Sequence, residues 1–354
     1  MGDVLDLIGL SLLPVCRWLG VAERLRAGHP PDLILHDQCI ATGRDAGELR
    51  RLATTAAANA GAAGLHGVFW SDADYPPMLS AIVDPPPVLW LRGPATALAA
   101  PAVAIVGSRA GSPYALAVAE KLAADLAQRG VTVVSGLARG VDSAAHRGAL
   151  SANGLTIAVL GCGADLVYPA EHRGLAREIA VSGAVISELA PRTAPLPMFF
   201  PQRNRIISGL SRAVVVIEAG EKSGSLITAR CALEQGRDVL AVPGNVLNGR
   251  NRGGHALIRD GAKIVETADD IVEELGVGVA LAGPIDGANS GSARQAADPV
   301  LASLAPGETF DLDRLAERTG LPAARLLPRL FELELQGLVR REGGGRFMRF
   351  DRSC

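Results

Sequence analysis

A turn of small residues and one arginine, Gly107-Ser108-Arg109, follows the apolar run at 103–106. Glycine lets a backbone approach an anion closely, the unpaired N–H groups at the start of a following helix attract that anion, and Arg109 adds a positive charge. The turn therefore predicts a phosphate-binding site, although tight packing of a strand against a helix would require the same glycines. It matches neither the dinucleotide fingerprint nor the P-loop.

A second turn of the same construction spans residues 135–143 and contributes Gly136, Arg139 and Gly140. Asp142 is placed to cap a helix that we expect to begin near residue 143. The repetition of glycine and arginine after a second apolar run strengthens the prediction of an anion site.

Two more turns differ in how strongly they indicate a phosphate-binding site. Residues 161–169 contain Gly161, Gly163 and Tyr168, and the demands of a tight turn explain them adequately. Residues 221–228 place a nest of small residues, with Gly224, Ser225 and Thr228, at the start of another expected helix. A phosphate fits the second of these turns.

The segment at 199–211 is the richest in polar and aromatic side chains. It joins Phe200 to Arg203, Asn204 and Arg205 at the start of an expected helix. Arginine and amide groups bind a phosphate backbone, and an aromatic ring stacks a base. The alternative is that the arginines pair with carboxylates and the phenylalanine fills the core.

No residue pattern indicates catalysis or a metal site. The six histidines are dispersed, no G-x-S-x-G elbow with triad partners occurs, and no carboxylate pair has an acid–base context. Asp142 and His146 are four residues apart and could face one metal, but no third ligand is near them, so a cap and a packed or exposed histidine are preferred. The five cysteines lack disulfide or zinc spacing. Several anion-binding turns without a reacting group favour a binding protein with no cofactor and no metal.

These turns require a scaffold that brings them to one edge. From residue 102 onward, β-branched runs alternate with amphipathic stretches, a pattern typical of a parallel sheet with crossover helices. We predict an α/β core, a Rossmann-like doubly wound and mostly parallel sheet that ends near residue 275. Ligands bind beyond the carboxyl ends of such strands. The expected strands are 103–106, 131–135, 156–160, 184–187, 213–218, 239–242 and 263–265.

Segments on either side of this core have different patterns. Residues 1–65 have apolar residues at helical spacing and predict a small helical domain, and a connector of turn formers with a short strand opens the region 66–275. Residues 276–297 are rich in Gly, Ala and Ser and predict a flexible linker. Residues 298–354 read as helix, helix, turn, helix and hairpin, which is a winged-helix outline.

The composition of the whole chain excludes few classes of protein. The chain of 354 residues has a formal net charge of −2, so it is not a uniformly basic polyanion binder, yet a local patch can still bind DNA because salt screens remote charges beyond about 10 Å. No apolar run is long enough for a membrane span. The apolar run at 5–13 has no basic residue before it, so we expect no secretory signal and a cytoplasmic protein without a membrane partner.

Several of these motifs together resemble the DNA-processing protein A family (DprA, also called Smf). The resemblance covers roughly residues 70–275, and its motifs occupy 106–109, 135–146, 200–211, 223–230 and 232–237, followed by Pro243-Gly244. It implies an N-terminal SAM-like helical domain and a C-terminal winged helix on the two flanks.

Membership would imply a dimer that binds and protects single-stranded DNA during natural transformation and helps to load the recombinase RecA, with no catalysis. The family's basic pocket includes the arginine of the G-S-R turn, here Arg109, beside an R-N-R segment that matches Arg203 to Arg205, with Phe200 able to stack a base. Many members carry a lysine three residues before that aromatic, where this chain has Pro197. One phosphate contact is therefore expected to be absent.

The winged helix leaves two interpretations open. Such domains bind either duplex DNA or other proteins. Acidic residues at 332, 334 and 342 offset the basic residues, which are Arg340, Arg341, Arg346, Arg349 and Arg352.

Two further functions compete with single-stranded DNA binding. A Rossmann-type enzyme that binds or hydrolyses nucleotides is the main alternative, but the P-G-G-x-G-T-x-x-E loop of such hydrolases is not matched at 223–228. Transcription regulation through the winged helix would require sequence-specific duplex binding.

Overall fold

The computed structural model of the chain describes residues 2–275, 309–319, 326, 330, 333, 339–342 and 346–349. The chain divides into two units, Met1–Ile285 and Asp286–Cys354, and each is described by itself.

A nine-stranded sheet organises the first unit, in the strand order β1-β2-β6-β5-β4-β3-β7-β8-β9. The seven strands from β6 to β9 are parallel, whereas β2 pairs antiparallel with β6 and β1 with β2. The chain enters the parallel part at β3 and builds outward first on one side and then on the other, so β3 and β7 flank the point where the strand order reverses. The strands are β1 (His66–Phe69), β2 (Val88–Arg92), β3 (Ala102–Val106), β4 (Thr132–Ser135), β5 (Thr156–Val159), β6 (Ala184–Ser187), β7 (Ala213–Val216), β8 (Asp238–Ala241) and β9 (Lys263–Ile264).

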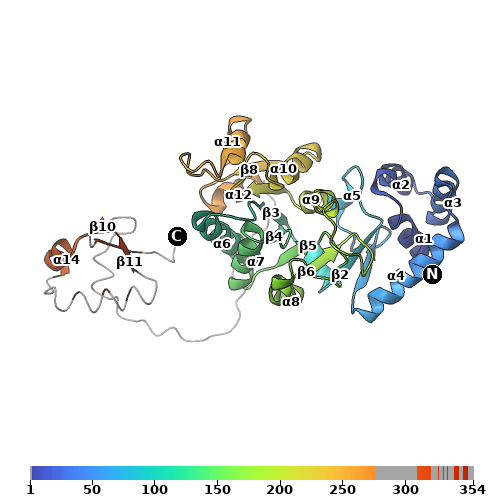
Figure 1. The fold of residues 1–354 in the computed structure, drawn as a ribbon, viewed down its shortest axis with the longest axis horizontal. Helices are drawn as coiled ribbons and strands as arrows, with labels where there is room; N and C mark the ends of the chain where they lie inside the picture. The colour runs from blue at the N-terminus through green and yellow to red at the C-terminus, as the bar shows by residue number, and fades with distance from the viewer. Residues whose placement is uncertain are drawn as a thin grey trace. The chain divides into compact units, whose positions relative to one another are not determined.

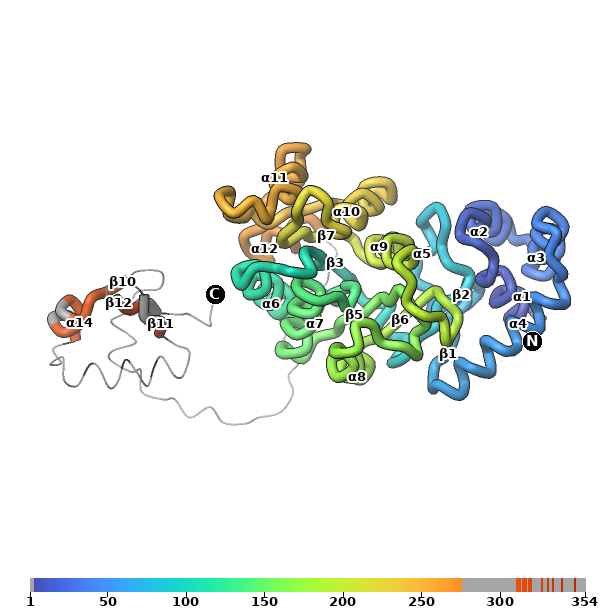
Figure 2. The backbone as a smooth tube through the Cα atoms, in the orientation of Figure 1, coloured from blue at the N-terminus to red at the C-terminus, as the bar shows by residue number. Residues whose placement is uncertain are grey.

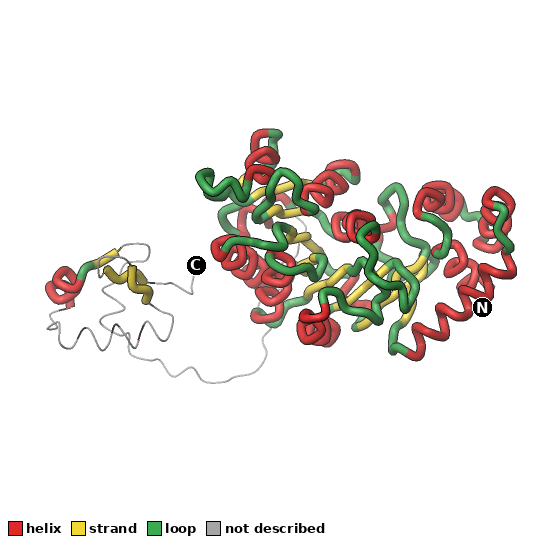
Figure 3. The backbone as a smooth tube through the Cα atoms, viewed as in Figure 1, coloured by secondary structure: helices red, strands yellow, loops and turns green. Residues whose placement is uncertain are grey.

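Helices cover both faces of this sheet (Figures 1 and 3). The central strands are runs of Ala, Val and Ile buried on both faces, as parallel strands between two helical layers must be. One layer contains α6 (Pro113–Gln128), α7 (Val141–Ser151), α8 (Arg173–Ser182) and α12 (Ala268–Glu274). The other contains α9 (Phe199–Gly209) and α10 (Ser225–Glu234), with the short α5 (Pro77–Ser80). The remaining elements are η2 (Ala95–Leu98), η3 (Ala170–His172) and α11 (Arg252–Arg259).

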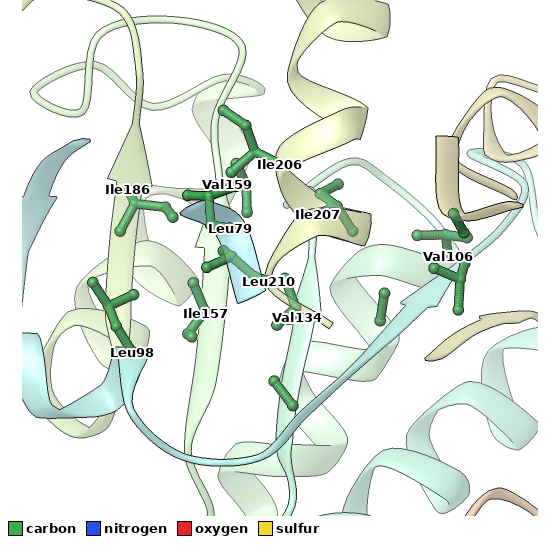
Figure 4. Close-up of a cluster of buried hydrophobic side chains, with 14 of the residues drawn as sticks. Leu79, Leu98, Val106, Val134, Ile157, Val159, Ile186, Ile206, Ile207 and Leu210 are labelled. Atoms are coloured by element: carbon green, nitrogen blue, oxygen red, sulfur yellow. The ribbon is translucent and has the colours of Figure 1, made fainter. Parts of the chain in front are cut away.

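The core under α9 fixes the position of that helix. Figure 4 shows Ile206 and Ile207 of α9, and Leu210 directly after it, on the side of the helix that faces Ile157 and Val134 of the sheet. All five side chains are buried. Because these apolar residues hold one side of the helix on the strands, Arg203 and Asn204, which precede them in α9, are placed at the carboxyl edge of the sheet.

Four helices precede the sheet in the same unit (Figure 2). Their apolar side chains form one cluster that also includes Val88 and Trp90 of β2. Asp45 begins the fourth helix, because its carboxylate accepts hydrogen bonds from the N–H groups of Gly47 and Glu48. The elements are α1 (Gly2–Ser11), η1 (Val15–Arg17), α2 (Trp18–Arg26), α3 (Pro31–Thr42) and α4 (Ala46–Ala62).

The second unit has a three-stranded sheet in the order β10-β12-β11. The described elements of this unit are β10 (Thr309–Phe310), α14 (Leu312–Thr319), β11 (Val339–Glu342) and β12 (Arg346–Arg349). Phe310, Leu315 and Phe347 form part of its apolar cluster. The predicted hairpin is confirmed by the antiparallel pairing of β11 with β12.

The predicted fold class is confirmed: the sheet is mostly parallel, it is covered on both faces, and all seven expected core strands form. Strand β1 was not predicted; it closes the edge beyond β2. The expected linker at 276–297 and the first expected helix of the winged-helix region lie outside the described residues. The domain boundaries stay predictions.

Within the described part of the chain, no single helix is long and apolar enough to cross a membrane. One bent pair, Asp3–Ser11 with Val15–Arg26, reaches that length and composition only when its two helices are taken together.

Candidate nucleic-acid interface

A cavity of about 760 Å³ lies at the carboxyl ends of β3 and β7, where the strand order reverses. This is the position at which doubly wound sheets bind ligands. We call it the larger cavity. Of the residues predicted from sequence, those that line it are Gly107, Ser108, Arg109, Phe200, Arg203, Asn204, Gly224, Ser225 and Thr228.

The turn after β3 forms one wall of the larger cavity. The N–H of Ser108 donates to the carbonyl of Glu218 at 2.7 Å, which ties this turn to the one after β7. Gly107 is required by packing, because a Cβ there would lie 2.7 Å from the Val141 side chain. Arg109 is exposed, and its guanidinium carbon lies 5.4 Å from the centre of the Phe200 ring. A cation is thus held beside an aromatic face at the rim.

The turn after β4 borders the larger cavity, and Ala138 of this turn lines it. The Nη1 of Arg203 donates to the carbonyl of Gly136 at 2.8 Å and also to the carbonyl of Val159. A Cβ on Gly136 would lie 2.4 Å from this guanidinium. Gly140 has a φ of 77°, and a Cβ there would lie 2.3 Å from the Ser108 carbonyl. Gly136 and Gly140 therefore shape the site without lining it.

Asp142 folds this turn instead of capping the helix. Helix α7 begins at Val141, and the Asp142 carboxylate accepts hydrogen bonds from the N–H groups of Gly136 at 3.1 Å and Ala138 at 3.4 Å. The prediction of a helix cap was wrong, because the helix begins before residue 143 and the carboxylate turns back to the preceding loop. His146 is buried, and its Nδ1 lies 2.7 Å from the Thr156 hydroxyl. The described residues contain no cluster able to hold a metal.

Burial shifts the pKa values of two ionisable residues that line the larger cavity, Arg203 and Asp142. It lowers the pKa of Arg203 to about 10, although the nearby Asp142 carboxylate acts in the opposite direction. It raises the pKa of Asp142, against the influence of Arg203 and of the two N–H groups. Arg203 is still cationic at neutral pH, and its guanidinium serves to join the ends of β4 and β5.

The turn after β7 forms the facing part of the lining. The Nδ2 of Asn204 donates to the carbonyl of Gly224 at 3.2 Å, so α9 is tied to the start of α10. The hydroxyls of Ser223 and Ser225 are 2.7 Å apart. Lys222 also lines the cavity, is exposed, and has no carboxylate partner among the described residues.

Tyr168 and Lys222 are among the lining residues that were missed as site residues from the sequence. The Tyr168 ring lies 5.4 Å from the Phe200 ring at an interplanar angle of 49°, so the loop after β5 adds an aromatic surface to the cavity. The turn at 161–169 was explained by structure alone, and nothing local distinguishes Tyr168 from a packing residue. Lys222 carried a visible signal, since it immediately precedes the Ser/Gly nest.

Two predicted arginines lie outside the larger cavity. Arg139 is on the surface, where its guanidinium binds the Glu171 carboxylate at 2.5 and 2.9 Å. Arg205 is buried on the opposite side of α9, where it pairs with Glu188 and Asp84. For Arg205 the structure favours the alternative of pairing with carboxylates.

Two family models match this chain. Residues 66–276 match the family described as DNA recombination-mediator protein A, and residues 288–345 match the DprA winged helix domain. The chain is 43% identical to Protein Smf of Escherichia coli over 79% of this chain and 76% of that protein. It is 46% identical to DNA processing protein DprA of Streptococcus pneumoniae over 56% of this chain and 71% of that protein.

Two solved structures have a similar fold. DNA processing protein A from Streptococcus pneumoniae superposes with a TM-score of 0.64 at 37% identity, covering 75% of this chain and 95% of that one. DNA processing protein A from Helicobacter pylori superposes with a TM-score of 0.54 at 30% identity, covering 60% of this chain and 97% of that one, in a structure concerned with its single-stranded DNA binding mode.

Proposed function

This chain belongs to the DNA recombination-mediator protein A (DprA/Smf) family, and from that premise we propose that it binds single-stranded DNA in the larger cavity. The observation that carries the proposal is the pairing of two exposed cations, Arg109 and Lys222, with the Phe200 and Tyr168 rings in one cavity. Cations that follow a backbone beside rings that stack bases are the two components of sequence-tolerant single-strand binding.

The cavity supplies its phosphate contacts from two turns. Arg109 after β3 and Lys222 after β7 bind phosphate oxygens, and a base stacks on the rim formed by Phe200 and Tyr168. Pro197 lines the same cavity at the position where the resemblance leads us to expect a lysine. Lys222 supplies a cation from a different turn, so we assign it one of the phosphate contacts.

The family resemblance is the basis on which we propose a wider role. We propose that the chain acts as a homodimer that protects incoming single strands during natural transformation and helps to load RecA onto them. The Streptococcus pneumoniae relative is named a DNA processing protein, and the Helicobacter pylori structure concerns single-stranded DNA binding, which supports the nucleic-acid part of this role. Reconstituted RecA filament assembly on strands already covered by a single-strand-binding protein would test the loading step.

A salt titration tests the DNA site. The variant Arg109→Ala/Lys222→Ala should bind a thymidine oligonucleotide at least about tenfold more weakly, since hydrogen bonds to charged groups contribute about 1.5 to 3 kcal/mol each. Its slope of log K against log salt should become shallower by about 1.4, because each single-strand phosphate contact contributes about 0.7. Fluorescence anisotropy at several salt concentrations measures both quantities.

Arg139→Ala is the matched control, because it also removes an exposed arginine that follows a glycine turn, but one that lies outside the cavity. Its affinity and salt slope should equal those of the unaltered protein. Wild-type binding by the double variant, or an equal loss in the control, would contradict the assigned site.

Nucleotide hydrolysis is the alternative function. Asp142 is the one carboxyl group among the described residues that line the larger cavity, and it is occupied by two backbone N–H groups. A sensitive assay of nucleoside monophosphate turnover by the purified chain would separate this alternative from DNA binding.

A further inference from the structure

A second cavity, of about 420 Å³, lies on the same edge of the sheet, at the carboxyl ends of β7 and β8. Its walls come from the start of α6, the residues that follow both strands, and the loop before α11. Because its functional side chains include those of Tyr114, Glu218, Asn245 and Asn248, we call it the amide cavity. None of the predicted site residues lines it.

The amide cavity offers hydrogen bonds and a ring but no cation. Its lining contains no Arg, Lys or His among the described residues. The side-chain oxygens of Asn245 and Asn248 accept hydrogen bonds from the N–H groups of Leu247 at 2.7 Å and Arg250 at 3.0 Å. This arrangement orients both amides and leaves their NH₂ groups as donors without a partner in the described part of the chain.

The other polar groups of the amide cavity are held in place. Both oxygens of the buried Glu218 carboxylate bind Ser112, one accepting from its N–H at 3.1 Å and the other from its hydroxyl at 2.6 Å. The Tyr114 hydroxyl donates to the Pro243 carbonyl at 3.3 Å, while 55% of the residue is exposed. Donors and one aromatic face without a cation suit an uncharged planar heterocycle and not a phosphate.

The backbone joins this cavity to the larger one. Glu218 lines the amide cavity, and its carbonyl binds the N–H of Ser108, which lines the larger cavity. Arg250 connects them again, because its N–H binds Asn248 and its Nη1 donates to the carbonyl of Ala110 at 3.0 Å. Arg250 is exposed and has no carboxylate partner among the described residues, so a cation lies between the two cavities.

We propose that the amide cavity binds one nucleobase of the strand whose backbone occupies the larger cavity, and that Arg250 contacts the phosphate between the two. The base stacks on the Tyr114 ring and accepts hydrogen bonds from the amides of Asn245 and Asn248. This inference rests on the proposed single-stranded DNA binding and adds a base subsite to it.

The test uses the full chain and thymidine strands of increasing length. The affinity of the unaltered protein should increase abruptly, in one step, at the strand length that first allows a base to reach the amide cavity. Replacing the terminal nucleotide of that strand by an abasic sugar, at each end in turn, should abolish the step at one end. Tyr114→Leu should lose the same step, about tenfold in Kd, since stacking on one aromatic side chain contributes about 1 to 3 kcal/mol.

Tyr114→Phe is the matched control, because it keeps the ring and should keep the step. The inference is overturned if the Tyr114→Leu variant keeps the increase in affinity with strand length, or if this variant binds abasic and intact strands with equally reduced affinity. It is also overturned if thymidine monophosphate binds at Tyr114 while the increase does not depend on that residue. If the unaltered protein binds no strand of any length, that result would instead contradict the proposed function itself.

Discussion

Burial and pairing with carboxylates decide which polar residues of this chain are available to a ligand. Arg109 and Arg139 follow similar glycine turns, yet Arg109 lies at the rim of the larger cavity while Arg139 is neutralised by Glu171. His146 shows how burial acts on a titratable group. It is fully buried against Thr156, and burial lowers its pKa from 6.5 to about 3. A residue with metal-binding chemistry is therefore a neutral part of the core.

The buried His146 makes the stability of the fold depend on pH. Its folded pKa is below its unfolded value, so its contribution is complete above pH 6.5 and is lost as the pH falls towards 3. Relative to a His146→Asn variant, the unaltered protein should lose about 2 kcal/mol more unfolding free energy between pH 7 and pH 5. Urea unfolding at several pH values measures the difference, and parallel pH dependence in the two proteins would contradict it.

The two opposite sides of helix α9 have different roles: one side lines the larger cavity and the other side forms buried ion pairs. Arg203 and Asn204 face the larger cavity, where Arg203 joins the ends of β4 and β5 and Asn204 binds the Gly224 carbonyl at the start of α10. Arg205 faces the other way, binds Glu188 and Asp84, and lies 5.1 Å from the centre of the Trp18 ring of α2. Burial raises the pKa of Glu188 and of Asp84, and Arg205 counteracts that effect. The helix thereby links the N-terminal helices to the site.

Removing Arg205 should damage stability more than DNA binding. Arg205→Ala leaves Glu188 buried without its partner, which should cost about 3 kcal/mol of unfolding free energy. The double variant Arg205→Met/Glu188→Gln should recover much of that loss, because the buried residue 188 then carries no charge and only the partly exposed Asp84 loses its cationic partner. Denaturant unfolding measures stability, and oligonucleotide titration of the folded protein should show a smaller change in affinity than for Arg109→Ala. A loss of affinity without a loss of stability would refute this assignment.

The chain as a whole consists of two units, and the proposed DNA site lies within one of them. Every residue that lines the larger cavity or the amide cavity falls within Met1–Ile285. The second unit has its own apolar cluster and its own sheet.

A fragment of residues 1–285 should therefore unfold cooperatively and bind single strands with an affinity within about threefold of the full chain. A difference of that size corresponds to less than 1 kcal/mol. Anisotropy titration and thermal unfolding of the fragment measure both properties. A much weaker fragment would assign single-strand contacts to the second unit.

The sequence alone determined the alternation of strands and helices, the family resemblance, and the glycine turns that must follow particular strands. These features are local, because periodicity and turn chemistry depend on residues close together in the chain. The turns that contribute to the larger cavity could be predicted for the same reason, since parallel strands bring their carboxyl ends to one edge.

Tertiary structure decided which side chains of those turns reach the cavity. The direction of Arg205 depends on Glu188 and Asp84, which are distant in sequence, and the role of Tyr168 depends on Phe200 from another loop. The amide cavity likewise joins the start of α6 to loops more than 100 residues later. Long-range contacts of this kind leave no local pattern, because each side chain responds to whichever charge or ring the folded chain brings beside it.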